Sequence, residues 1–203
     1  LVFMSVMAIY RQYVILAVWP WPLVPFYDWT IFPPAASMLD GNGVGGLVAL
    51  VLTVAAGAVL LARRHLAGAA LLCWVIALLP VSHLVPIPVG AGERFLYLPS
   101  VALALLIASV VPAALARYRV PVLVLATSLT LAGLATTLVR NTHWRDTVTV
   151  FQRAAVDFPE SYNVHFALGG MLAARGDLEP AVAHFLLAEE RLPGLPSTTS
   201  GLA

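Results

Sequence analysis

The chain has 203 residues, of which 61% are hydrophobic and only 10% are charged, and its mean hydropathy is +0.91. Soluble domains carry about 25% charged residues, so this composition excludes an ordinary soluble protein and predicts a membrane protein. The net charge of +1 comes without a basic cluster, so nothing in the charge indicates a nucleic-acid partner.

The first apolar segment covers residues 1–18 and is interrupted by Arg11 and Gln12, so it predicts either a spanning or a half-inserted helix. It ends at residues 19–22, a Trp-Pro-Trp-Pro run in which proline stops a helix and tryptophan prefers the membrane interface. Prolines, aspartates and aromatic residues alternate over residues 23–42. This composition predicts an irregular loop at the membrane surface, because lipid-exposed irregular backbone is excluded from the hydrocarbon layer.

Four further apolar segments are near the roughly 20 residues that a helix needs to cross a bilayer. They cover residues 45–62, 66–84, 100–116 and 120–139. Basic turns at Arg63-Arg64-His65 and Arg117-Tyr118-Arg119 join them in pairs. Because Lys and Arg are enriched in cytoplasmic loops, both turns are predicted to be cytoplasmic, and the two assignments agree. Residues 19–44, the 81–99 loop and everything after Arg140 are then predicted to lie on the periplasmic, extracellular or lumenal side.

Residues 1–140 are thus predicted to be the C-terminal part of a polytopic membrane domain, with more membrane helices upstream. Polar residues recur after Val139, so residues 141–193 are predicted to form a soluble region. The spacing over 160–193 fits the tetratricopeptide pattern of about 34 residues, with helices near 160–174 and 178–191. The matching positions are Leu168, Gly169, Leu172, Gly176, Asp177, Ala181, Phe185, Ala188 and Pro193. Gly176 is predicted to be a left-handed C-cap, and Asp177 an N-cap.

Half of a repeat precedes the whole one. Phe151, Ala154 and Pro159 lie 34 residues before Phe185, Ala188 and Pro193. Residues 145–158 are therefore predicted to form a lone helix that links the last membrane helix to the repeat. One and a half repeats rarely stand alone, so we expect that either the membrane domain covers the open face or the chain continues. Residues 194–203 are rich in Ser, Thr, Gly and Pro and are predicted to be disordered.

The most unusual stretch is Ala91 to Ser100, which places Glu93 beside Arg94 between two apolar segments. Ionisable residues at such a place are rare, and they usually face a cavity or a partner. This stretch is therefore the leading candidate for a functional site. The alternative is a structural pair, in which Glu93 and Arg94 hold the loop on the helix ends.

Several stretches form one ordered series. They are Trp19-Pro20-Trp21-Pro22-Leu23 before Tyr27-Asp28-Trp29, Leu79-Pro80-Val81-Ser82-His83-Leu84, Glu93-Arg94-Phe95-Leu96-Tyr97-Leu98-Pro99-Ser100, Arg140-Asn141 with Trp144-Arg145, and the tetratricopeptide spacing. The series resembles the TMTC family of transmembrane and tetratricopeptide repeat proteins, which are regarded as O-mannosyltransferases of the GT-C superfamily. The resemblance implies an all-α fold, with a partial GT-C-like bundle of transmembrane helices followed by a short tetratricopeptide hairpin. It also implies transfer of mannose from a polyprenyl-phosphate carrier to an outward-facing protein or glycan acceptor.

Two departures limit what this chain is expected to do. His83 stands where the family often has asparagine. The enzymes of the superfamily also place a catalytic acidic residue in the first outward loop, which is absent here. The catalytic acid is therefore expected upstream of Leu1, and the chain resembles the second half of a transferase that would not act alone.

Under this resemblance, Arg94 is predicted to bind the donor phosphate, because a guanidinium is planar, permanently charged and suited to a phosphate leaving group. Glu93 would orient Arg94 or bind a divalent metal. Tyr97, one helical turn beyond Glu93, would donate to a phosphate or sugar oxygen. The membrane lipid, the lipid-linked sugar and a protein bound by the repeat are the expected partners.

Other polar residues are weaker candidates. Asp28 and Asp40 would assist acceptor deprotonation or metal binding, or would serve turns beside proline and glycine. His83 is a candidate cavity residue, either as a loop hydrogen-bonder or as a base. The five histidines show no metal-ligand spacing, and the lone Cys73 excludes a disulfide framework.

Two further hypotheses for the function belong to other classes of protein. One is a non-catalytic membrane anchor whose tetratricopeptide segment recruits partner proteins. The other is a ligase or polymerase of surface polysaccharide, some of which also carry such repeats.

Overall fold

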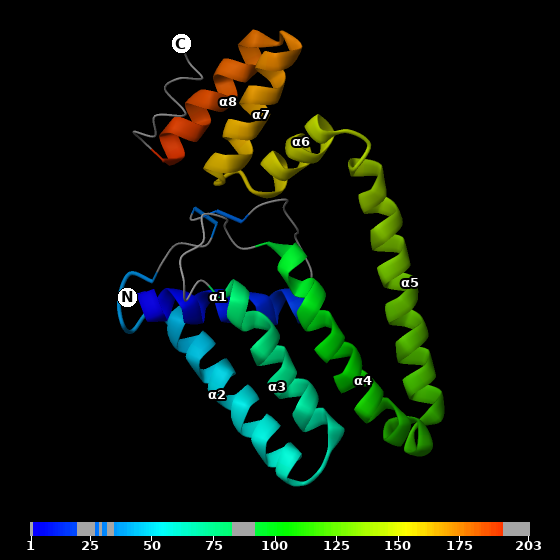
Figure 1. Cartoon of the computed structure of the whole chain (residues 1–203). Coiled ribbons are helices and arrows are strands. Elements are labelled where there is room, and N and C mark those ends of the chain that lie inside the picture. Colours follow the sequence, from blue (N-terminus) through cyan, green and yellow to red (C-terminus); the bar gives the residue numbers. More distant parts are fainter. Residues whose placement is uncertain (1, 20–26, 29, 32–34, 83–91, 193–203) are drawn as a thin grey trace. The chain divides into compact units, whose positions relative to one another are not determined.

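The computed structural model describes residues 2–19, 27, 28, 30, 31, 35–82 and 92–192. Throughout these residues the regular secondary structure is helical, which confirms the all-α prediction (Figure 1). The chain divides into two compact units. Unit 1 consists of Leu1–Trp21 and Pro34–Leu134, and unit 2 consists of Pro22–Pro33 and Ala135–Ala203.

The helices follow the apolar segments of the sequence. Those of unit 1 are α1 (Val2–Val18), α2 (Gly41–Ala62), α3 (Leu66–Leu78) with the 3-10 turn η1 (Leu79–Val81), and the 3-10 turn η2 (Glu93–Leu96) that leads into α4 (Tyr97–Arg117). Helix α5 (Arg119–His143) begins in unit 1 and ends in unit 2. Those of unit 2 are α6 (Thr147–Asp157), α7 (Tyr162–Arg175) and α8 (Leu178–Arg191).

Three of the described helical segments are long and apolar enough to cross a membrane. They are Gly41–Ala62, Glu93–Arg117 and Arg119–Thr142, whereas Val2–Val18 and Leu66–Val81 are shorter apolar helices. Only 11% of the most apolar window of each of the first two, and none of the third, is buried within the protein. The remaining apolar surface is suited to contact with lipid, so the chain has the helices of a membrane protein.

Glycines let the helices of unit 1 approach closely. Helices α2 and α3 pack against each other, and α3 packs against α4. At the α2–α3 contact, a Cβ atom on Gly68 would collide with the backbone nitrogen of Leu61 and lie 2.7 Å from the carbonyl oxygen of Gly57. Small residues of this kind allow backbone contact between membrane helices, where the hydrophobic effect supplies no driving force.

Helix α1 lies across α2 instead of running alongside it (Figure 1). The crossing point is made by Gly43 and Gly46 near the start of α2. A Cβ on Gly46 would overlap the carbonyl group of Met7, and one on Gly43 would lie 2.9 Å from the carbonyl oxygen of Met4. Neither glycine can therefore carry a side chain while α1 keeps this path.

Helix α2 begins at Gly41, before the apolar run that starts at Gly45, because Asp40 caps it. The Asp40 carboxylate accepts a hydrogen bond from the backbone N–H of Gly43, at 3.0 Å. This satisfies one of the N–H groups that a helix start leaves unpaired. Asp40 therefore has a structural role at a helix end.

In unit 2, α7 packs between α6 and α8. A Cβ on Gly169 of α7 would lie 3.0 Å from the ring of Phe185, so the absence of a side chain makes room for that ring. Gly176 ends α7 with a φ of 89°, which confirms the predicted left-handed C-cap. Asp177 is the residue before α8, but its side chain makes no capping hydrogen bond.

Gly68→Ala should lower the thermal stability of the chain in detergent micelles, because the new methyl group would push α2 away from α3. Overpacking of this kind costs about 1–3 kcal/mol. Gly133→Ala is the matched control, since a Cβ there meets open space on α5. A Gly68→Ala chain that melts at the parent temperature would contradict the close α2–α3 contact.

Candidate functional site

The predicted phosphate-binding stretch forms the turn η2 and the first residue of α4. Arg94 is exposed, and its guanidinium lies 5.1 Å from the centre of the Phe95 ring, in a cation–π arrangement. Its Cγ and Nε atoms each approach to 3.7 Å of the place where a Cβ of Gly92 would be. The Arg94 side chain thus folds back over the chain that leads into the turn.

Glu93 and Tyr97 lie beside Arg94 in the same stretch. Glu93 is partly exposed and Tyr97 is 81% exposed. The structure therefore brings the three predicted donor-binding residues to one helix start, while their binding roles stay predictions. No group of three His, Cys, Asp or Glu side chains that could hold a metal occurs among the described residues.

Helix α1 brings a fourth polar group to this place. Tyr13 is only 2% exposed, and its hydroxyl lies near the backbone N–H of Gly92 and within electrostatic range of Arg94. The hydroxyl nevertheless has no hydrogen-bond partner among the described residues. Tyr10, one turn earlier on α1, is 6% exposed and its hydroxyl is likewise without a described partner. Buried polar groups without partners are rare and require an explanation.

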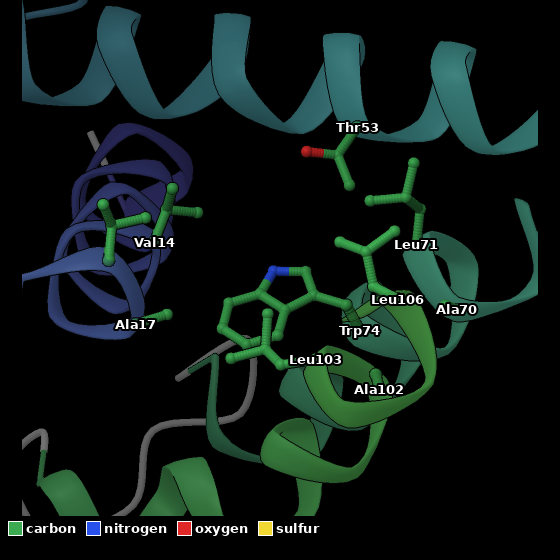
Figure 2. Close-up of a pocket in the computed structure, with 10 residues that line it drawn as sticks. Val14, Ala17, Thr53, Ala70, Leu71, Trp74, Ala102, Leu103 and Leu106 are labelled. Atoms are coloured by element: carbon green, nitrogen blue, oxygen red, sulfur yellow. The ribbon is translucent and has the colours of Figure 1, made fainter. Parts of the chain in front are cut away.

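An apolar cavity of about 140 Å³ lies between α1, α2, α3 and α4 (Figure 2). It is lined by Val14, Ala17, Val18, Thr53, Ala70, Leu71, Trp74, Ala102, Leu103 and Leu106. Its one hydroxyl group, on Thr53, donates to the carbonyl of Ala49 at 2.7 Å and so offers little to a ligand. A dry apolar cavity of about 150 Å³ holds a benzene-sized group, so this one suits a short segment of hydrocarbon.

Asp28 is placed in unit 2, where it forms a buried polar cluster with the start of α7. Its side chain is 4% exposed. One carboxylate oxygen accepts from the Ser161 hydroxyl at 2.6 Å and from the Asn163 backbone N–H at 3.1 Å. The other accepts from the backbone N–H and hydroxyl of Thr30 and from the backbone N–H of Ile31.

This cluster completes the cap of α7. Ser161 is the N-cap residue, and its hydroxyl oxygen accepts from the Val164 backbone N–H at 3.2 Å while its proton goes to Asp28. A negative charge at a helix N-terminus is also favourable for the helix dipole. Tyr27 adds an edge-on ring contact to Phe158, with centroids 6.2 Å apart. Asp28 thus serves a local turn, as one prediction had it, and also a distant helix end.

The helices α7 and α8 share a pair of histidines. The Nδ1 atoms of His165 and His184 are 3.1 Å apart, and the ring centroids are 5.3 Å apart, so the two nitrogens face each other. The Nε2 atom of His165 lies 3.1 Å from the carbonyl oxygen of Pro159, which can only accept. His165 therefore carries its proton on Nε2, and His184 donates from Nδ1 to the bare Nδ1 of His165. A second proton between the rings would break this bond.

The remaining candidate, His83, lies outside the described residues. The sequence prediction did not include Tyr13 or Ser161. The only sequence signal for Tyr13 was its place beside Arg11 and Gln12, the polar interruption of an apolar helix. Ser161 had the signal of an ordinary N-cap, a serine before a helical pattern, but nothing in the sequence linked it to Asp28.

No protein-family model, curated protein or solved structure matches this chain.

Asp28→Asn should weaken the start of α7, because every group that contacts the carboxylate is a donor and the new amide NH₂ would face two of them. We expect a loss of about 2 kcal/mol, measured as faster hydrogen exchange at the Asn163 and Val164 amides. Asp40→Asn is the matched control, since asparagine caps helices as well as aspartate does. Unchanged exchange in Asp28→Asn would contradict the described cluster.

Acidification should loosen the α7–α8 pair. Burial, and then the neighbouring His165, lower the pKa of His184 from the ordinary histidine value. The unfolded state therefore binds the proton more readily, so this contribution to stability is complete above about pH 6.5 and is lost as the pH falls below it. The measurement is amide protection in α7 and α8, corrected for intrinsic exchange, from pH 7.5 to 5.

His184→Gln should flatten this pH dependence. His65→Gln, which changes the N-cap of α3, should leave it in place. Protection in α7 and α8 that stays constant in the parent chain over this range would contradict the shared-proton arrangement.

Proposed function

We propose that the chain is the donor-binding part of a GT-C-type membrane glycosyltransferase, which moves a sugar from a polyprenyl-phosphate carrier to an outward-facing protein or glycan. The observation that supports this most directly is Arg94. An exposed cation stands at the start of a helix long enough to span a membrane. Cations at a membrane edge are suited to the phosphate of a lipid-linked substrate.

In this proposal the acceptor oxygen attacks the anomeric carbon of the sugar while the bond from that carbon to the phosphate oxygen breaks. The bonding electrons leave with the phosphate, and the guanidinium of Arg94 stabilises the charge that develops there. Tyr97 would donate to a phosphate or sugar oxygen, and Glu93 would hold Arg94 in position. The proton of the acceptor would go to the carboxylate of the catalytic acidic residue that the TMTC resemblance implies.

The apolar cavity supports a lipid-linked donor over a soluble sugar nucleotide. Its walls come from α1, α2, α3 and α4, and a nucleotide would find neither charge nor free hydrogen-bonding groups among the lining residues apart from the Trp74 indole. A hydrocarbon chain fills such a space without loss of hydrogen bonds. Mannose as the sugar rests on the family resemblance alone.

The helices α6, α7 and α8 would be the half repeat and the full repeat of a tetratricopeptide region. In this proposal they lie on the outward side and help to present the acceptor. The support is the packing order of the three helices, together with the glycine, alanine and phenylalanine contacts at the positions of the pattern.

A second candidate, a membrane-anchored scaffold, is favoured by one specific observation. Val148 on α6 is 5% exposed under the neighbouring helices, whereas Val182, its counterpart 34 residues later on α8, is 44% exposed. Leu178 and Leu186, one turn to either side of Val182, are 65% and 55% exposed. The same repeat position is thus covered in α6 and open in α8, as expected for a surface that takes up a further helix.

Replacement of Arg94 tests the transferase. In the full-length membrane protein, supplied with polyprenyl-phosphate sugars, Arg94→Ala should reduce transfer by about 100-fold or more, because a donor to the developing charge is lost. Arg94→Lys should restore only part of the rate, since an ammonium lacks the planar fork. Arg64→Ala, in a basic turn at the far end of α2, is the control and should keep the parent rate.

Two outcomes would count against the proposal. Transfer at the parent rate by both Arg94 variants would remove Arg94 from the mechanism. No donor consumption by the parent protein, beside an active control enzyme, would reject the transferase and leave the scaffold as the better account.

A further inference from the structure

We propose that Tyr13 and Arg94 together bind one phosphate group of an amphiphile, with the Tyr13 hydroxyl as a direct hydrogen-bond donor to a phosphate oxygen. Neither the sequence pattern nor the proposed function assigns a role to Tyr13. The Tyr13 side chain is almost fully buried, and its hydroxyl has no hydrogen-bond partner among the described residues.

An unpartnered buried hydroxyl is unfavourable in the free protein, because it has left water without gaining a hydrogen bond. A phenylalanine at this position would keep the ring contacts and avoid that loss. A tyrosine is therefore understandable if its hydroxyl gains a partner in another state of the protein, and a bound ligand supplies such a partner.

The groups around the hydroxyl indicate the charge of that ligand. The Gly92 backbone N–H and the Arg94 guanidinium are both donors. Helix α1 contacts the turn η2, the Gly92 N–H lies near the Tyr13 oxygen, and the charge of Arg94 is within electrostatic range of it. A phenol keeps its proton near neutral pH, so it adds a third donor. Glu93, the neighbouring acid, is the one carboxylate in the turn η2. Several donors around one point are suited to an anion with more than one oxygen, and a phosphate accepts from all of them at once.

The rest of α1 indicates an amphiphile. Ala17, one helical turn beyond Tyr13, lines the apolar cavity with its neighbours Val14 and Val18. The cavity takes its other walls partly from α4, which continues directly from the turn that carries Arg94. A phosphate bound by Tyr13 and Arg94 would thus lie near the apolar cavity, because α1 and α4 both lead from these residues to the cavity walls.

The natural ligand is inferred from the proposed function, in which the donor carries a lipid phosphate, but phosphate binding itself does not require sugar transfer. The test therefore measures binding. The chain in neutral-detergent micelles is titrated calorimetrically with dodecyl phosphate, with inorganic phosphate and with dodecanol. We expect the dodecyl phosphate to bind most tightly. Inorganic phosphate that binds equally well would overturn the amphiphile part of the inference.

Tyr13→Phe should weaken the binding of dodecyl phosphate roughly ten-fold or more, which is the usual loss for a hydrogen bond to a charged group. It should not lower the melting temperature of the ligand-free chain, since no partner within the protein is lost. Tyr10→Phe is the matched control on the same helix, with an equally buried and unpartnered hydroxyl. It should leave the affinity unchanged.

Three results would overturn the inference. The first is parent-like affinity in Tyr13→Phe. The second is a lower melting temperature of ligand-free Tyr13→Phe, which would show that the hydroxyl already has a structural partner. The third is an equal loss of affinity in Tyr10→Phe, which would show a general loosening of α1. Phosphate binding that depends on Tyr13, in a protein that transfers no sugar, would uphold this inference and reject the proposed function.

Discussion

The crossing of α1 over α2 is the contact on which the candidate site depends. Gly43 and Gly46 bring the two backbones together, and a side chain at Gly46 would overlap the carbonyl of Met7. Because α1 is thereby held across the bundle, its second half reaches both the apolar cavity and the turn that carries Arg94. A glycine pair thus determines where Tyr13 lies, although neither glycine is near the proposed phosphate-binding groups in the sequence.

The positions of the helices could largely be predicted from the sequence, whereas the contacts between residues of different helices could not. Apolar length predicts α2, α4 and α5, because a bilayer imposes its thickness on any helix that crosses it. The C-cap role of Gly176 is also predictable from the sequence, since the left-handed backbone conformation at a helix end is a local requirement that glycine meets most easily. The path of α1 could not be predicted in this way, because it depends on the crossing with α2. The glycines at that crossing, Gly43 and Gly46, have a sequence pattern that is equally typical of helices packed side by side.

Asp28 illustrates the same limit for polar residues. Its neighbours Thr30 and Ile31 satisfy one carboxylate oxygen, and this local part follows from the turn-forming habit of aspartate. The other oxygen is used 133 residues away, by Ser161. No local rule can reveal such a contact, because Ser161 already has the pattern of a complete N-cap. The loop between α1 and α2 therefore contributes a residue to a helix of unit 2.

Asp28 and Tyr13 are both buried polar residues in this apolar chain, but they differ in their hydrogen bonds. Asp28 has hydrogen-bond donors on both oxygens and is fully accounted for within the protein, so its burial stabilises unit 2. The hydroxyl of Tyr13 has no hydrogen-bond partner among the described residues, although the Gly92 N–H lies near it and the charge of Arg94 is within electrostatic range. In a chain with so few polar groups, we propose that a ligand supplies the partner of this hydroxyl. This contrast, more than the presence of Arg94 alone, distinguishes the structural cluster at Asp28 from the proposed binding site at Tyr13.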